Sequence, residues 1–181
     1  MGLFDIFTGT KRPTGDIEPR SAAEVRAALL AVNRETAPFV IRDGADQGVD
    51  LIAEWRIVDA RWYEIFAKAG LSKTFQILMR LDPEAHEVRA VDREWEVRWR
   101  AGVPELSVAA SGFRGQKVAV EFGTAHAFTE QLDYGQVYNY RFATKELKEP
   151  ITQVVTGNGW TYRGVALSLI HISEPTRPER I

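Results

Sequence analysis

The stretch Lys73–Ala101 constrains the fold more than any other part of the chain. Its first half alternates apolar and polar residues with a period of two, which is typical of a strand with one buried face. The apolar positions are Phe75, Ile77, Met79 and Leu81. Asp82-Pro83 then predicts a turn, because proline presets φ and aspartate bonds the backbone ahead of it. A second alternating row follows with Trp95, Val97 and Trp99. We therefore predict a long β-hairpin.

The second strand of this hairpin changes phase. Val88 and Ala90 occupy even positions, whereas the apolar row from Val91 onward occupies odd ones. A slip of one residue turns every later side chain to the opposite face, so the pattern predicts a β-bulge near Ala90-Val91. With that bulge, Arg93 would lie in the apolar row beside the two tryptophans.

Three segments have the pattern of helices. Ser21 with Glu24 forms a capping-box sequence that predicts a helix over 21–33. An apolar stripe between a candidate N-cap and Gly70 predicts another over 59–70. A third is expected over 144–156, where Pro150 would either kink the helix or belong to the first turn of a shorter helix that begins near residue 149. The shorter helix costs less, since proline is tolerated in the first turn.

The remaining periodic segments read as strands joined by short turns. They cover residues 39–42, 50–58, 106–110, 118–122, 138–142 and 160–166. Strands that follow one another without intervening helices favour antiparallel pairing. We predict an α+β fold, with an antiparallel meander sheet of about five strands, a further N-terminal hairpin and a C-terminal strand. Two or three short helices would pack against it.

The two ends are expected to lie outside this domain, which we place at residues 21–166. Residues 1–20 begin with a short apolar segment and continue rich in Gly, Pro and charge, which predicts a flexible arm. The stretch LSLIHISEPTR (167–177) resembles the translation of a transposase adapter used in sequencing libraries, residue by residue. We expect residues 167–181 to be a non-native tail and the natural sequence to depart near Ala166.

Composition narrows the classes of function. The 181 residues include 23 basic and 25 acidic side chains, a net charge of -2, which gives no electrostatic reason to expect nucleic acid. The chain has no cysteine, which excludes disulfides and thiolate metal sites. No apolar run reaches the ~20 residues of a membrane span. We expect a cytoplasmic protein without a metal or cofactor.

Motifs of known chemistry are absent from the sequence. It contains no phosphate-binding loop, nucleophile elbow or zinc-binding HExxH pattern. His126 is the one weak catalytic candidate, and no neighbour in the sequence supplies a partner for a general base. An enzyme of unrecognised class with its site around His126 is therefore an alternative hypothesis.

The aromatic residues are the most distinctive remaining feature. We predict a ligand-binding set made of Arg93, Trp95, Trp99, Tyr138 and Tyr140. The same rings would also suit a closed core, in which case Arg93 would be a structural ion-pair member. If they form a partly open pocket, Arg93→Ala abolishes binding without lowering the melting temperature much.

The first functional hypothesis is accordingly a non-enzymatic module that binds a protein or a small apolar ligand on an aromatic-rich sheet face. A third hypothesis is peripheral membrane attachment through residues 2–7, whose apolar side chains suit a lipid surface. An exposed edge strand would also permit a homodimer.

Overall fold

The computed structural model describes residues 9–57, 59, 62, 66–67, 73–108, 114–115, 120–126 and 137–165, and between 107 and 145 it describes the backbone alone. The helical elements are α2 (Ala22–Leu30), the short 3-10 helix η1 (Ala45–Gln47) and α4 (Thr144–Gly157). The strands are β1 (Phe39–Asp43), β2 (Leu51–Trp55), β3 (Lys73–Asp82), β4 (Glu87–Arg100), β5 (Val103–Val108), β6 (Arg114–Gly115), β7 (Val120–His126), β8 (Val137–Ala143) and β9 (Thr161–Gly164).

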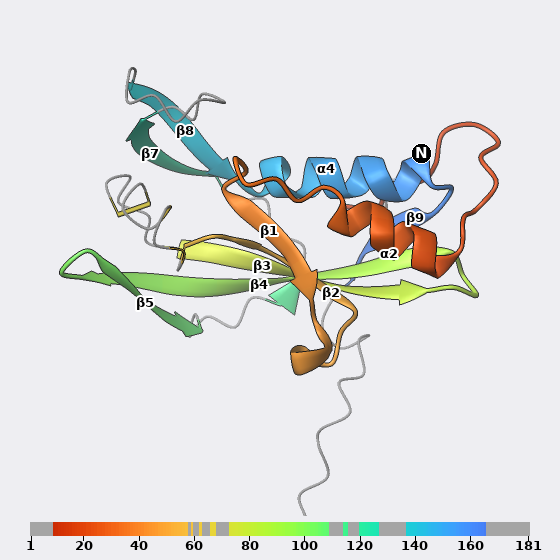
Figure 1. The fold of residues 1–181 in the computed structure, drawn as a ribbon, viewed down its shortest axis with the longest axis horizontal. Coiled ribbons are helices and arrows are strands. Elements are labelled where there is room, and N and C mark those ends of the chain that lie inside the picture. Colours follow the sequence, from red (N-terminus) through yellow and green to blue (C-terminus); the bar gives the residue numbers. More distant parts are fainter. Residues whose placement is uncertain are drawn as a thin grey trace, which may run out of the picture.

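The described part of the chain contains a seven-stranded, mostly antiparallel sheet built around β4. Strands β1 to β5 are neighbours in chain order. One edge of β4 pairs with β3, and its other edge pairs in turn with β9, β6 and β5. Helices α2 and α4 lie on one face of this sheet, and the loop that carries η1 projects from the other (Figure 1). The predicted α+β class with a mostly antiparallel sheet is confirmed.

Two parts of the topology differ from the prediction. Strands β7 and β8 pair with each other in a separate two-stranded sheet, so they do not continue the meander. Strand β9 pairs with β4 in parallel, with Val88 opposite Tyr162. Helix α4 makes this possible, because it carries the chain along the sheet before β9 begins, as parallel strands require.

The predicted bulge near Ala90-Val91 is wrong. The register between β3 and β4 runs without interruption from Lys73 opposite Glu96 to Asp82 opposite Glu87. Even positions of β4 therefore keep facing the helices, but there the apolar row gives way to two buried acids, Asp92 and Glu94. The apolar row therefore moves from even to odd positions because acidic residues replace apolar ones on the inner face. The pairing of the two strands does not shift.

The main core lies between the sheet and the two helices. Paired residues of neighbouring strands share a face, and this inner face carries Ile41, Ala53, Ile77, Met79 and Ala90. The same cluster contains Trp62 and Phe66, two of the described residues of the predicted helix 59–70. Most of that segment lies outside the described residues.

Helix α2 begins as its sequence predicts. The Glu24 backbone N–H donates to the Ser21 hydroxyl at 3.3 Å, and the Ser21 N–H donates to the Glu24 carboxylate at 2.9 Å. These hydrogen bonds, the one from the Ser21 side chain foremost, lower the pKa of Glu24. The capping box is thus complete, and it satisfies two backbone donors that the first turn leaves open.

Helix α4 (Thr144–Gly157) contains Pro150 in its interior, so the shorter helix predicted from residue 149 is wrong. Proline inside a helix costs about 3 kcal/mol. The buried stripe formed by Leu147, Ile151 and Val155 is fully covered, and each such side chain contributes about 1.5–3 kcal/mol. The first turn supplies Leu147, and the burial of that side chain offsets much of the cost of the proline.

The chain before α2 contacts the domain over residues 11–20. Lys11 forms a two-bond bridge with Tyr162 of β9, each bond 2.8 Å long. The indole N–H of the buried Trp160 donates to the Arg20 carbonyl at 2.7 Å. Among the described residues, no helix is long and apolar enough to cross a membrane.

Candidate functional site

Four side chains gather on the outer face of the sheet, opposite the helices. Thr74 lies directly across from Trp95, and Gln76 lies across from Arg93. These residues alternate along β3 and β4 with the inner-face residues, so all four project to the same side. We call them the outer-face cluster. Two of its members, Arg93 and Trp95, are residues that the sequence singles out.

Hydrogen bonds fix the tryptophan and the glutamine in this cluster. The Trp95 indole N–H donates to Gln76 Oε1 at 2.9 Å. The amide nitrogen of Gln76 donates in turn to Glu54 of β2, which also accepts from Arg42 Nε at 2.8 Å. The half-buried indole is therefore held at a fixed angle by a chain of bonds that crosses four strands.

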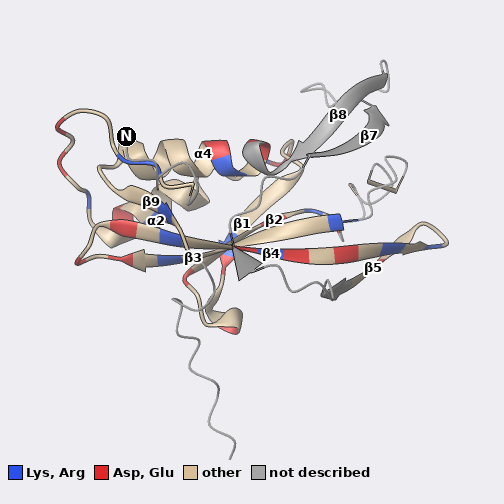
Figure 2. Cartoon of the chain, turned by 180° about the vertical axis from the view of Figure 1, so that it is seen from behind, with Lys and Arg blue, Asp and Glu red and all other residues tan. Residues whose placement is uncertain are grey.

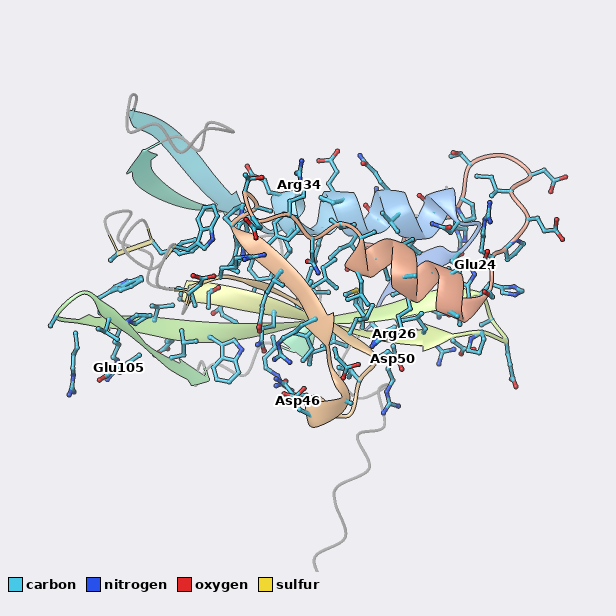
Figure 3. The ribbon with its side chains drawn as sticks, viewed as in Figure 1. Glu24, Arg26, Arg34, Asp46, Asp50 and Glu105 are labelled. Atoms are coloured by element: carbon cyan, nitrogen blue, oxygen red, sulfur yellow. The ribbon has the colours of Figure 1, made fainter. Side chains whose placement is uncertain are left out.

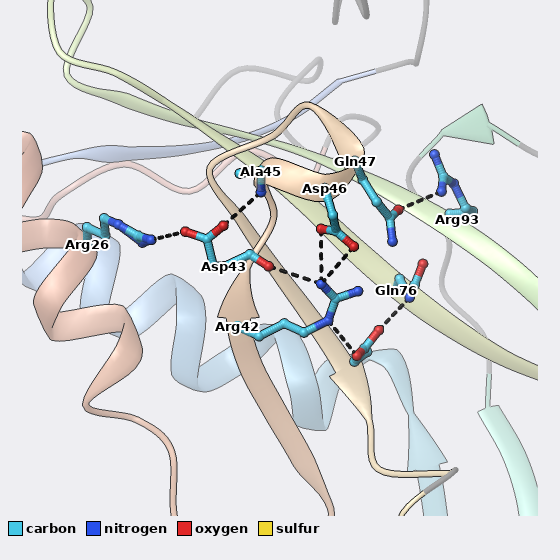
Figure 4. Close-up of polar contacts among 9 residues, drawn as sticks. Arg26, Arg42, Asp43, Ala45, Asp46, Gln47, Gln76 and Arg93 are labelled. Carbon is cyan, nitrogen blue, oxygen red and sulfur yellow. Dashed lines mark hydrogen bonds and ion pairs between the residues drawn. The ribbon is translucent and has the colours of Figure 1, made fainter.

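Arg42 anchors the far end of this chain (Figure 4). Its guanidinium contacts Glu54 and, at 3.2 Å, the Asp46 carboxylate in the η1 loop. Partial burial acts to lower the pKa of Arg42, but the bonds and charges of Glu54 and Asp46 outweigh it, so the pKa is raised. The arginine therefore stays charged at every physiological pH.

The η1 loop also reaches Arg93. The guanidinium donates from Nη1 to Gln47 Oε1 at 2.8 Å (Figure 4). Arg93 and Trp95 are two residues apart on one strand, a spacing of about 6.6 Å. A cation and a flat aromatic surface thus lie side by side.

Thr74 adds a buried hydroxyl to the same place. The residue is 7% exposed, and its Oγ1 has no hydrogen-bond partner among the described residues. A buried hydroxyl without a partner costs about 1–3 kcal/mol, so folded proteins rarely keep one. Here it stands beside a fixed tryptophan and a cation.

The other predicted ligand-binding residues lie elsewhere. Trp99 packs against the main core. Tyr138 and Tyr140 belong to β8, opposite Ala125 and Gly123 of β7, in the sheet that is separate from β4. His126 is the last residue of β7. The side chains of these last three lie outside the described residues, so their roles stay predictions.

A second polar group lies on the inner face, under α4. Lys148 Nζ contacts the Asp92 carboxylate at 2.5 Å, and the two side chains are 16% and 3% exposed. Lys73 Nζ contacts the buried Glu94 at 3.2 Å. Burial, and then the charge of Asp92, raise the pKa of Tyr162 well above its usual value. In the described part of the chain, no three acidic or histidine side chains are placed to hold a metal ion.

Sequence patterns alone do not indicate Thr74, Gln76 or Gln47. Thr74 and Gln76 occupy the polar positions of an alternating strand, which normally face water. Gln47 lies in a turn. The only signal for them is the register of β3 against β4, because it puts both polar residues opposite Trp95 and Arg93.

Acidic and basic residues both occur along β4 (Figure 2). No family model, curated protein or solved structure matches this chain.

Proposed function

We propose that this protein is a non-enzymatic binding domain that holds a small, flat, largely apolar ligand on the outer face of its sheet, at the outer-face cluster. The observation that carries the proposal is the buried, unpartnered hydroxyl of Thr74 directly across from Trp95. A ligand with one polar atom beside an aromatic ring would satisfy both residues.

The tryptophan supplies the contact area. Aromatic rings prefer offset or edge-on contacts with other rings, worth about 0.5–1.5 kcal/mol beyond their buried area. The bond from the indole N–H to Gln76 removes most of the freedom that Trp95 would otherwise lose on binding. Pre-organisation of this kind lowers the entropic cost of association.

The threonine supplies selectivity. A site that is built to bond a polar group rejects an analogue that lacks it, because the protein group is then left buried without a partner. Without a ligand, the Thr74 hydroxyl is already buried and has no hydrogen-bond partner among the described residues. Binding would therefore remove a cost that the folded protein carries.

N-phenyl-1-naphthylamine, a neutral fluorescent probe with two ring systems and one N–H, tests the proposal. We expect saturable binding that Trp95→Leu weakens about tenfold or more. Thr74→Val should weaken binding and at the same time raise the melting temperature, because it replaces an unpartnered hydroxyl by a methyl group.

Two matched variants serve as controls. Trp55→Leu removes a buried tryptophan of β2 from the main core, and Thr14→Val removes an exposed hydroxyl; neither should change the probe affinity of the folded protein. Binding that is unaffected by both Trp95→Leu and Thr74→Val would refute the proposal. A lower melting temperature for Thr74→Val would show that its hydroxyl has a partner within the protein.

A protein partner, a homodimer, catalysis at His126 and membrane attachment through residues 2–7 stay predictions from the sequence. So does the cytoplasmic location. None of them has a contact among the described side chains in its favour.

A further inference from the structure

The direction of each hydrogen bond between Trp95 and Arg42 follows from the chemistry of the groups. An indole N–H can only donate, so the atom of Gln76 that faces Trp95 is the amide oxygen. The amide nitrogen of Gln76 then points the other way and needs an acceptor, which Glu54 of β2 supplies. Arg42 is also purely a donor, and its Nε contacts the same carboxylate at 2.8 Å.

The strand register brings these side chains together. Glu54 lies directly across from Gln76 in the β2–β3 pair. Gln76 lies across from Arg93 in the β3–β4 pair, and Trp95 is the next residue on that face of β4. Side chains at directly opposite and diagonal positions of an antiparallel pair are close enough to interact. The sheet itself therefore sets Glu54, Gln76 and Trp95 within hydrogen-bond reach.

Glu54 is the acceptor that links the two halves of this chain of bonds. Its Oε1 accepts from Arg42, and its Oε2 accepts from Gln76 (Figure 4). Arg42 is held in turn by Asp46 on the η1 loop, which projects from the sheet on the side away from the helices (Figure 3). Most of the Glu54 side chain is covered, with 24% exposed, and charge-assisted hydrogen bonds gain strength away from water. A carboxylate has no donor, so it accepts the Gln76 amide in one orientation only.

We propose that Glu54 is the positioning residue of the outer-face cluster. Its charge sets the direction of the Gln76 amide, and the amide oxygen holds the Trp95 ring at the angle against which a flat ligand packs. Glu54 acts through Gln76 and not by contact with the ligand. The inference rests on the proposed function, and it adds the residue that sets the affinity of that site.

The ring itself tests the inference without any ligand. The chain has five tryptophans, and each indole N–H gives one signal in a nitrogen–proton correlation spectrum, in which Trp95→Leu identifies the signal of Trp95. We expect the heteronuclear NOE of this signal to equal that of the rigid backbone in the wild-type protein and to fall in Glu54→Leu. The affinity for N-phenyl-1-naphthylamine should fall about two- to tenfold in the same variant, the usual cost of immobilising one side chain on binding.

A reversal of bond direction separates positioning from packing. Gln76→Glu alone sets two carboxylates against each other, so it should free the Trp95 ring and weaken the probe. In the double variant with Glu54→Gln, the carboxylate at position 76 accepts from Trp95 and from the amide at position 54, whose oxygen accepts from Arg42. Only the middle bond changes direction, so the NOE and the probe affinity should both return toward the wild-type values. Effects of packing alone would add, without such recovery.

Glu87→Leu is the matched control. Glu87 is another mostly covered acid of the sheet, with a side chain 16% exposed, and it contacts Arg163 at 3.2 Å and Arg89 at 3.4 Å. Its removal takes away a carboxylate paired with arginine, as Glu54→Leu does, but leaves the bonds of Trp95 intact. The Trp95 signal and the probe affinity should both stay unchanged.

Each outcome decides one question. An NOE of Trp95 that is equal in the wild-type protein and Glu54→Leu would overturn this inference, and Trp95-dependent binding of the probe would still leave the proposed function standing. Probe binding that does not depend on Trp95 would remove the proposed function, and the inference with it. If Glu54→Leu does not fold, the double variant is compared with the wild-type protein and with Gln76→Glu. A double variant that does not regain the wild-type NOE would overturn the role of Glu54.

Discussion

The buried ion pair between Lys148 and Asp92 offers the sharpest test of the fold. It joins α4 to β4 with 2.5 Å between Nζ and Oδ2, and both side chains are mostly hidden from water. Lys148→Met keeps the length of the side chain and its apolar stem but removes the charge. Asp92 would then be a buried carboxylate without its lysine.

The expected loss follows from that burial. Breaking a buried pair by removal of one partner costs about 3–5 kcal/mol, whereas an exposed pair contributes about 0–1 kcal/mol. Arg100 and Glu105 form such an exposed pair at the β4–β5 turn, with side chains 81% and 50% exposed. We therefore expect Lys148→Met to lower the free energy of unfolding by about 3–5 kcal/mol, and Arg100→Met to change it by less than about 1 kcal/mol.

Urea unfolding followed by tryptophan fluorescence measures the free energy of unfolding of both single variants. Far-UV circular dichroism serves as a second probe of two-state behaviour. The double variant Lys148→Met with Asp92→Leu separates the charge from the packing. It should recover most of the loss, because two apolar side chains of similar volume often replace a buried ion pair at no cost. A loss below about 1 kcal/mol for Lys148→Met, or a double variant less stable than the single one, would refute this reasoning.

Three further predictions concern single positions. Tyr162→Phe removes a fully buried hydroxyl that has no hydrogen-bond partner among the described residues. The substitution should leave the free energy of unfolding at pH 7 unchanged or raise it by about 1–3 kcal/mol. A clear destabilisation would show that the hydroxyl is hydrogen-bonded. Because the folded pKa of Tyr162 is raised, the wild-type protein should lose stability as the pH rises above about 10, where the unfolded tyrosine ionises, and Tyr162→Phe should remove that part of the loss in urea titrations. Gly159 has φ +76°, and an added Cβ would lie 2.8 Å from the Pro19 Cα. Gly159→Ala should therefore lower the free energy of unfolding by about 2 kcal/mol or more. The control is Gly157→Ala, where a Cβ meets nothing within 4 Å, and it should not lower the melting temperature. Ala101 has φ +47° in a two-residue turn, so Ala101→Asn should raise the free energy of unfolding by about 0.5–1 kcal/mol, and an unchanged urea midpoint would contradict the strain that we assign to it.

Local patterns determined the elements that need only their own residues. The Ser21 capping box sets the start of α2, because its two bonds join residues three positions apart. The alternation in 73–82 gives β3, and the predicted turn at Asp82-Pro83 is stabilised by Asp82, which accepts from the Ala85 backbone N–H at 3.0 Å. Such bonds close within one turn of chain, so no distant residue is needed to select them.

Tertiary contacts decided the rest. Asp92 and Glu94 look like solvent-facing residues in the sequence, but they are buried, and Lys148 and Lys73 from other elements pair with them. Pro150 stays inside α4 because the sheet covers Leu147. The candidate site depends on the same kind of information. The sequence singles out Trp95 and Arg93. Thr74, Gln76 and Gln47 join them only through the strand register and the η1 loop. These bring together residues that lie up to 46 positions apart in the chain. A one-dimensional pattern records which face a residue occupies, whereas the partner across that face is set by the packing of the whole sheet.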